Sequence, residues 1–158
     1  MEESNIQGAK GLSWIKPDSW TASEGSSMRL ASFSVPFSEG VGDLSVIKLS
    51  GTGGGLESNV NRWRGQLDLS SLSINQIEKN ISHMDGNLGE YGMIEIINKN
   101  DGRTFLGAIF PLDESTIFVK LSLKESGIKF VQNIEVGKKI KLTELRKKHD
   151  AILIATGV

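Results

Sequence analysis

The sequence predicts an α+β domain in which helices pack on an antiparallel sheet of about five strands. Five segments have strand character, because apolar and polar residues alternate along them or because β-branched residues are concentrated in them: 28–35, 43–50, 91–98, 103–110 and 116–123. A segment with helical periodicity separates the second strand from the third. Strands that surround one principal helix, without regular strand–helix alternation, are typical of α+β architecture.

Turn signals indicate that neighbouring strands pair as hairpins. Residues 36–42 contain the proline and glycines of a loop between the first two strands. Residues 98–102, Asn-Lys-Asn-Asp-Gly, are a strong turn signal between the third and fourth strands. Residues 111–115 turn the chain into the fifth strand, where Phe118 and Lys120 are expected on one face.

The principal helix is predicted by an apolar stripe whose members recur every three or four residues: Leu56, Val60, Trp63 and Leu67. Gly65 lies within this segment and weakens the helix by about 1 kcal/mol relative to alanine. Ser73 can cap a second, short helix whose apolar side carries Ile74, Ile77 and Ile81.

The N-terminal end predicts a flexible lead-in over residues 1–12, followed by the domain at 13–122. Trp14 and Trp20 bracket a Pro-Asp turn signal at residues 17–18. Indoles are seldom left exposed, so we expect both to pack in the core or along its edge.

Residues 123–158 differ from the rest of the chain in charge. Residues 1–122 hold 10 basic and 15 acidic side chains, a net charge of −5, whereas residues 123–158 hold 8 basic and 4 acidic, a net charge of +4. Thr143 can cap a helix, and residues 151–155 form a continuous apolar run typical of a buried parallel strand. We interpret this segment as a tail of different origin, which could still pack on the same domain.

The composition excludes several classes of function. The net charge of −1 provides no field that would attract nucleic acid, and the absence of cysteine excludes disulfides, thiolate nucleophiles and cysteine metal sites. No run approaches the ~20 apolar residues of a membrane span, and no signal peptide is visible. We expect a soluble protein of undetermined compartment, placed in the cell envelope or periplasm if an export signal is missing. Unpaired edge strands would favour a homodimer.

Residues 13–122 resemble a bacterial family of uncharacterised proteins known mainly from planctomycetes and verrucomicrobia. The resemblance rests on the W-x-x-P-x-x-W string at 14–20, on MRLASFSV at 28–35, on the dense match over 53–67, and on FLGAIFPL and TIFVKLS. It implies a PsbP-like fold and a role in binding, although fold alone does not fix function. The usual export signal, the C-terminal helix and the last strand of that family have no counterpart here.

Residues 124–158 are similar to a fragment of the small subunit of glutamate synthase, an FAD- and NADPH-dependent oxidoreductase. The similarity implies that Ala155, Thr156 and Gly157 correspond to a strand end beside the flavin dinucleotide. The G-x-G-x-x-G fingerprints and the cysteine-ligated iron–sulfur segment of that family are missing from this chain. We therefore expect no bound cofactor.

One polar group is a candidate ligand site, next to a glycine run between a strand and the principal helix. Its members are Gly53, Gly54, Gly55, Asn59, Asn61, Arg62 and Arg64. Two arginines beside a glycine turn could hold a carboxylate or phosphate. The spacing fits neither a P-loop nor a Rossmann turn, so we favour a crossover with unusual backbone angles and arginines that pair locally.

No residue is singled out as catalytic or as a metal ligand. His83 and His149 are isolated, and no G-x-S-x-G elbow is present. We expect a non-catalytic binding or accessory module of bacterial origin, with an unidentified protein or small-molecule partner. The alternatives are an FAD/NADPH-dependent oxidoreductase fragment and a small hydrolase that uses the glycine-run region.

Overall fold

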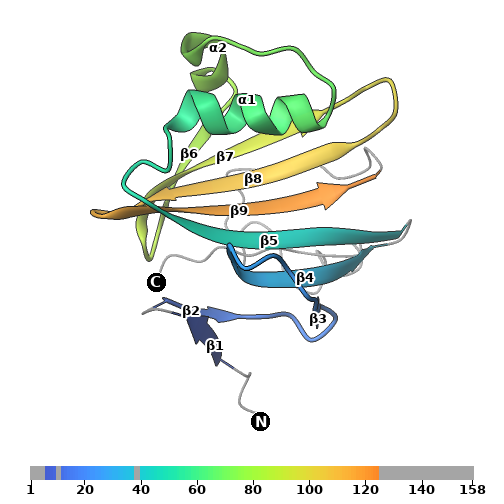
Figure 1. Ribbon diagram of the computed structural model, residues 1–158, viewed down its shortest axis with the longest axis vertical. Coiled ribbons are helices and arrows are strands. Elements are labelled where there is room, and N and C mark those ends of the chain that lie inside the picture. Colours follow the sequence, from blue (N-terminus) through green and yellow to red (C-terminus); the bar gives the residue numbers. More distant parts are fainter. Residues whose placement is uncertain (1–5, 10–11, 38–39, 125–158) are drawn as a thin grey trace, which may run out of the picture.

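The computed structural model describes residues 6–9, 12–37 and 40–124, and these form a predominantly β protein (Figure 1). The elements in chain order are β1 (Ile6–Ala9), β2 (Leu12–Ile15), β3 (Thr21–Ala22), β4 (Arg29–Phe37), β5 (Gly40–Ser50), α1 (Leu56–Gln66), α2 (Ile74–Glu78), β6 (Ser82–Gly86), β7 (Gly89–Ile97), β8 (Thr104–Pro111) and β9 (Ser115–Leu123). Seven strands form one antiparallel sheet in the order β3-β4-β5-β9-β8-β7-β6, and β1 pairs separately with β2.

The predicted α+β, PsbP-like arrangement of helices on a five-stranded sheet is wrong. The five expected strands are present as β4, β5, β7, β8 and β9, but β3 and β6 extend the sheet to seven strands and only α1 is longer than five residues. The additional strands escaped prediction because their side chains are short or polar. In β6, for example, His83 and Asp85 are exposed, and the strand forms because it pairs with β7 across the turn at Gly86–Gly89.

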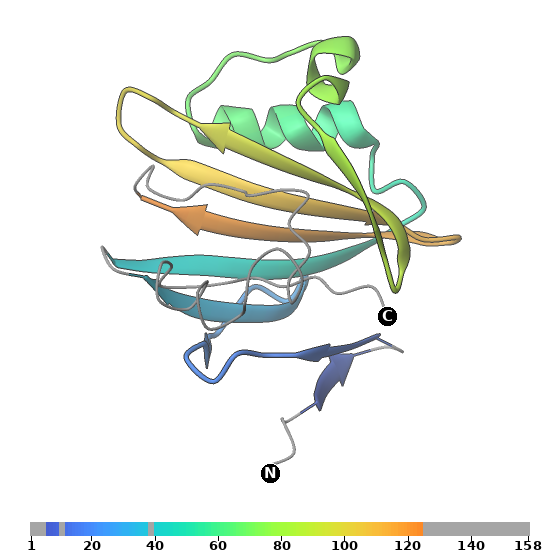
Figure 2. The same cartoon turned by 180° about the vertical axis from the view of Figure 1, so that it is seen from behind.

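One face of the sheet, which we call the helix face, carries α1 (Figures 1 and 2). The stripe predicted for this helix is the stripe that packs, since Val60, Trp63 and Leu67 are buried against strand side chains of β7, β8 and β9. Trp63 meets Phe118 edge to face, with ring centroids 6.2 Å apart. A Cβ on Gly107 would lie 2.4 Å from Trp63 Cζ3, so glycine is what lets the indole reach the backbone of β8.

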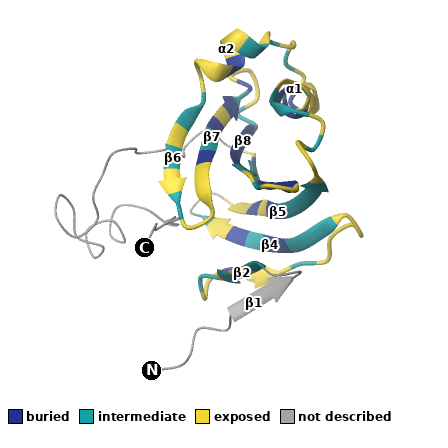
Figure 3. Cartoon of the chain, turned by 90° about the vertical axis from the view of Figure 1, so that its left-hand side faces the viewer, coloured by how far each residue is buried: buried dark blue, intermediate teal, exposed yellow. Residues whose placement is uncertain are grey.

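The opposite face of the sheet, the far face, is covered at its β4–β5 end by β2 and the segment that follows it. Trp20 packs against Phe33, and Trp14 lies at the edge of the same cluster. Both tryptophans are therefore packed, as predicted. Figure 3 shows the β1–β2 hairpin on the side of β4 that is turned away from α1.

The alternation along β5 and β9 fixes which side chains share a face. Leu44 and Val46 belong to the far-face cluster, whereas Leu49 and Phe118 pack with α1. Lys120 has the same parity as Phe118 and therefore lies on the helix face, as the sequence predicted. Within the described residues, no helix has the length and apolar content needed to cross a membrane.

Candidate functional site

The glycine run forms a tight crossover from β5 into α1. Gly53, Gly54 and Gly55 all have positive φ angles of 61°, 92° and 86°, a backbone region that favours glycine. At position 53 a larger residue would also clash, because a Cβ on Gly53 would lie 2.7 Å from the Phe118 ring. The unusual backbone angles predicted for this crossover are confirmed.

Asn59 holds this crossover in place. Its side chain is 2% exposed, and its Nδ2 group donates to the carbonyl oxygens of Gly53 (2.8 Å) and Gly55 (2.7 Å). Its Oδ1 atom accepts a hydrogen bond of 2.7 Å from Arg62 Nη2. The amide of Asn59 is thus committed to backbone carbonyls of its own chain, which is a structural role.

Asn61 and Arg64 fasten a different segment, the loop after α1. The amide of Asn61 both donates to the carbonyl and accepts from the N–H of Leu72, each at 2.8 Å. Arg64 Nε donates to the carbonyl of Ser70 at 2.7 Å. Hydrogen bonds therefore link Gly53, Gly55, Asn59 and Arg62, whereas those of Asn61 and Arg64 go to the loop after α1.

A shallow hollow of about 550 Å³ lies beside the glycine run, and its lining does not suit an anion. It is bounded by Gly54, Gly55, Leu56, Glu57, Ser58, Asn61 and Ile74. Glu57 is the charged residue of that lining, and it lies in the first turn of α1. A carboxylate at this end of the helix already complements the helix dipole and repels a second negative group.

A cluster that sequence reasoning did not identify lies further along the helix face. The pairing of β4, β5 and β9 places Ser32, Ser45 and Lys120 in one row across the three strands. The adjacent row is Ser34, Asp43 and Ser122. Both rows are polar, in contrast to the apolar part of the same face beneath α1.

Lys120 is the centre of this cluster. Its Nζ atom lies 4.2 Å from the centroid of the Phe105 ring and donates a hydrogen bond of 2.8 Å to Gln66 Oε1 on α1. Burial, together with the positive charges of Arg29 and Arg62 and against an opposing effect of Asp43, lowers the pKa of Lys120 to about 8. Among the described residues, no carboxylate forms an ion pair with this ammonium.

Asp43 does not balance the charge of the cluster because Arg29 already binds it. The two guanidinium nitrogens of Arg29 contact both carboxylate oxygens of Asp43, at 3.2 and 3.1 Å. We call Arg29, Asp43, Arg62, Gln66 and Lys120 the Lys120 cluster. With one carboxylate and three cations, it carries an excess positive charge at neutral pH.

The sequence offered only a weak signal for this cluster. A lysine on the same face as Phe118, within an apolar strand, could have been recognised as half-buried. Its partners could not, because the hydrogen bond from Lys120 to Gln66 joins residues 54 positions apart. Of the seven predicted site residues, only Arg62 belongs to the cluster.

The remaining polar groups of the described residues show no second cluster with unbalanced positive charge. His83 Nδ1 lies 3.4 Å from Glu90 Oε1, and both side chains are largely exposed on the β6–β7 hairpin. Within the described residues, no group of three or more histidine, aspartate or glutamate side chains could hold a metal ion. His149 and the flavin-related residues Ala155, Thr156 and Gly157 lie outside the described residues.

No family model, curated protein or solved structure matches this chain. Both resemblances seen in the sequence therefore remain predictions, and the case for function rests on the geometry of the described residues.

Proposed function

We propose that this chain is a non-catalytic binding module that recognises an oxyanion, a carboxylate or phosphate group of its ligand, at the Lys120 cluster. The observation that carries the proposal is the half-buried ammonium of Lys120, which has two cationic neighbours and no carboxylate partner among the described residues. A charge held in this way is unfavourable until a negative group joins it.

The cluster offers two kinds of donor to such a group. Arg62 is exposed and uses one guanidinium nitrogen to bind Asn59, which fixes the direction of its side chain. Lys120 supplies an ammonium that is already oriented by Gln66 and Phe105. A planar guanidinium fork beside an ammonium is a common arrangement for binding carboxylates and phosphates.

Anion binding at this site also has a defined linkage to protonation. A bound negative charge would favour the charged form of Lys120 and raise its pKa from about 8 towards the ordinary value of 10.5. Binding would therefore take up a proton around pH 8 and above, and affinity would fall as the pH rises through that range.

Thermal unfolding in sodium phosphate, compared with sodium chloride at matched ionic strength, tests the proposal. We expect phosphate to raise the midpoint of the wild-type protein, because a ligand that binds only the folded state stabilises it. The rise should be lost in Lys120→Met and reduced in Arg62→Gln. Lys48→Met is the matched control, since Lys48 lies on β5 but on the far face, and it should retain the effect.

An equal response of wild type and Lys120→Met, or no response beyond that to chloride, would contradict the proposal. The two alternatives from the sequence, an oxidoreductase fragment and a small hydrolase, receive no specific support from the described residues. The bacterial cell envelope remains our prediction for the place of action if an export signal is missing.

A further inference from the structure

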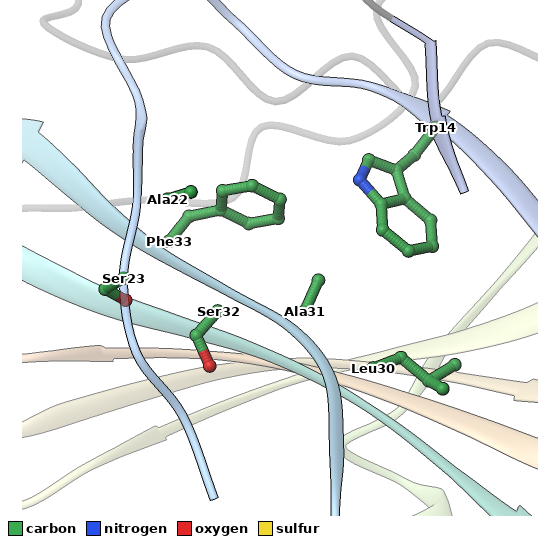
Figure 4. A pocket seen from close by; sticks show the side chains of 7 residues that line it. All are labelled: Trp14, Ala22, Ser23, Leu30, Ala31, Ser32 and Phe33. Atoms are coloured by element: carbon green, nitrogen blue, oxygen red, sulfur yellow. The ribbon is translucent and has the colours of Figure 1, made fainter. Parts of the chain in front are cut away.

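A pocket of about 410 Å³ lies at the β4 edge of the molecule, between β4 and the residues of β2 and β3 (Figure 4). It is lined by Trp14, Ala22, Ser23, Leu30, Ala31, Ser32 and Phe33. A volume of this size is within the range of small-molecule sites, which are mostly apolar with a few polar groups that fix orientation.

The pocket exists because β3 is only two residues long. Thr21 and Ala22 pair with Ser34 and Phe33, and the N–H of Ser23 adds one more hydrogen bond to the carbonyl of Ser32 at 2.9 Å. Beyond that point β3 no longer covers the outer edge of β4. Trp14, which β2 supplies, borders the space that is left.

Two of the lining residues are aromatic, and none of those that the structure describes carries a formal charge. Figure 4 shows Trp14 and Phe33 on two sides of the pocket with the Ala31 methyl group between them, and Ser32 pointing away from both rings. The Ser32 hydroxyl is engaged elsewhere, since it accepts a hydrogen bond of 3.2 Å from Arg29 Nη1. The surface that faces a ligand therefore combines aromatic and aliphatic side chains with a comparable amount of polar surface.

The indole nitrogen of Trp14 is the second observation that points to a ligand. It is buried and has no hydrogen-bond partner within the part of the chain that the structure describes. In Figure 4 the edge of the indole that carries this nitrogen faces Phe33, across the pocket. A buried donor without an acceptor is rare in folded proteins, because it costs free energy. A ligand oxygen that accepts its hydrogen bond removes this cost, and the free energy of binding becomes more favourable.

We propose that this pocket binds a small, uncharged aromatic molecule with one hydrogen-bond acceptor oxygen. The ring lies between Trp14 and Phe33, over Ala31, and the oxygen accepts the hydrogen bond from Trp14 Nε1. Among the described residues the lining has no charged side chain, so we expect an uncharged ligand here, in contrast to the oxyanion proposed for the Lys120 cluster.

Titration of the full chain with acetophenone, followed through the indole N–H signals by NMR, tests this proposal. The three tryptophans give three such signals, and Trp14→Phe assigns one of them. We expect the Trp14 signal to move downfield as it donates a hydrogen bond to the ketone, while the signal of Trp63, which lies on the helix face, serves as the internal control. Ethylbenzene, which lacks the acceptor, and benzoate, which is charged, should bind more weakly at this position.

Trp14→Phe keeps an aromatic wall but removes the donor, and we expect the affinity for acetophenone to fall about fivefold, the effect of one neutral hydrogen bond. If this variant does not fold, the titration of the wild-type protein still tests the proposal. An unmoved Trp14 signal at saturating acetophenone, equal movement of all three signals, or tighter binding of benzoate at Trp14 would overturn the proposal.

Discussion

Lys120 Nζ donates a hydrogen bond of 2.8 Å to Gln66 Oε1, and this bond ties the central strand β9 to the last residue of α1. The same ammonium lies over the Phe105 ring of β8 at 4.2 Å. Three elements therefore hold one cation in a fixed position on the helix face. Neither the ring nor the amide carries a negative charge, so the ammonium has no charged partner among the described residues, and this is why we connect it with ligand binding.

We predict that Lys120→Met stabilises the protein at pH 7. Burial of the ammonium disfavours its charged form, and methionine fills a similar volume without charge. The free energy of unfolding should increase by about 1 kcal/mol. This is less than the pKa shift alone would give, because solvent still reaches the side chain and screens its charge. Urea denaturation of both proteins measures it, and a loss of more than 1 kcal/mol would contradict this description of Lys120.

The stability of the wild type should also depend on pH in a specific window. The pKa of Lys120 is about 8 in the folded state and about 10.5 when unfolded, so the unfolded state binds more protons between these values. The free energy of unfolding should therefore rise from pH 8 to pH 10.5 relative to that of Lys120→Met. The difference between the two proteins, measured across this range, cancels the titration of other groups.

Asn59→Ala should destabilise the protein by about 2–4 kcal/mol. The change removes the side-chain donor to the partly buried carbonyls of Gly53 and Gly55, of which Gly55 keeps a backbone donor, and it removes the partner of Arg62. Asn61→Ala is a useful comparison, because it also removes two backbone hydrogen bonds, but at a less buried position. If Asn59→Ala is neutral in urea denaturation, the structural role assigned to this residue is wrong.

Two glycine substitutions should have opposite effects. Gly107→Ala forces a methyl group against Trp63 and should destabilise by about 1–3 kcal/mol. Gly65→Ala places the same methyl group in open space on α1 and should stabilise by up to about 1 kcal/mol. Thermal unfolding of both variants measures the contrast, and equal shifts would contradict the packing of Trp63 on β8.

Tyr91, the single tyrosine, provides an optical measure of burial in the sheet. Its ring stacks on Phe110 with centroids 4.6 Å apart, its hydroxyl is buried without a partner, and burial raises its pKa above 10.0. Absorbance at the phenolate wavelength should titrate at higher pH in the folded protein than in urea. Because the folded state keeps its proton longer, stability falls as the pH rises above 10, and Tyr91→Phe should remove this fall.

The sequence was sufficient for the parts of the fold that depend on periodicity. The five strand segments are present as β4, β5, β7, β8 and β9, and the stripe of α1 selected Val60, Trp63 and Leu67 as the packed face. It was insufficient for β3 and β6, whose residues carry little intrinsic strand preference and become strands only through their neighbours. The resulting error in fold class came from counting strands by propensity.

The candidate site was harder to predict for the same reason. Arg62 and Gln66 are one turn apart on a helix and could be grouped from the sequence, but Arg29 and Lys120 join them only after β4, β5 and β9 have paired. Asn59, Asn61 and Arg64 looked like ligand-binding groups, and their hydrogen bonds go to backbone carbonyls instead. Polar side chains near glycine turns often form hydrogen bonds with the backbone groups of the turn.

The most direct test of the central claim is the pKa of Lys120, followed by NMR of its side chain without and with phosphate. We predict a value of about 8 in chloride and an increase towards 10.5 as phosphate saturates the Lys120 cluster. A pKa that stays the same in both solutions would show that no anion is bound beside this ammonium and would contradict the account.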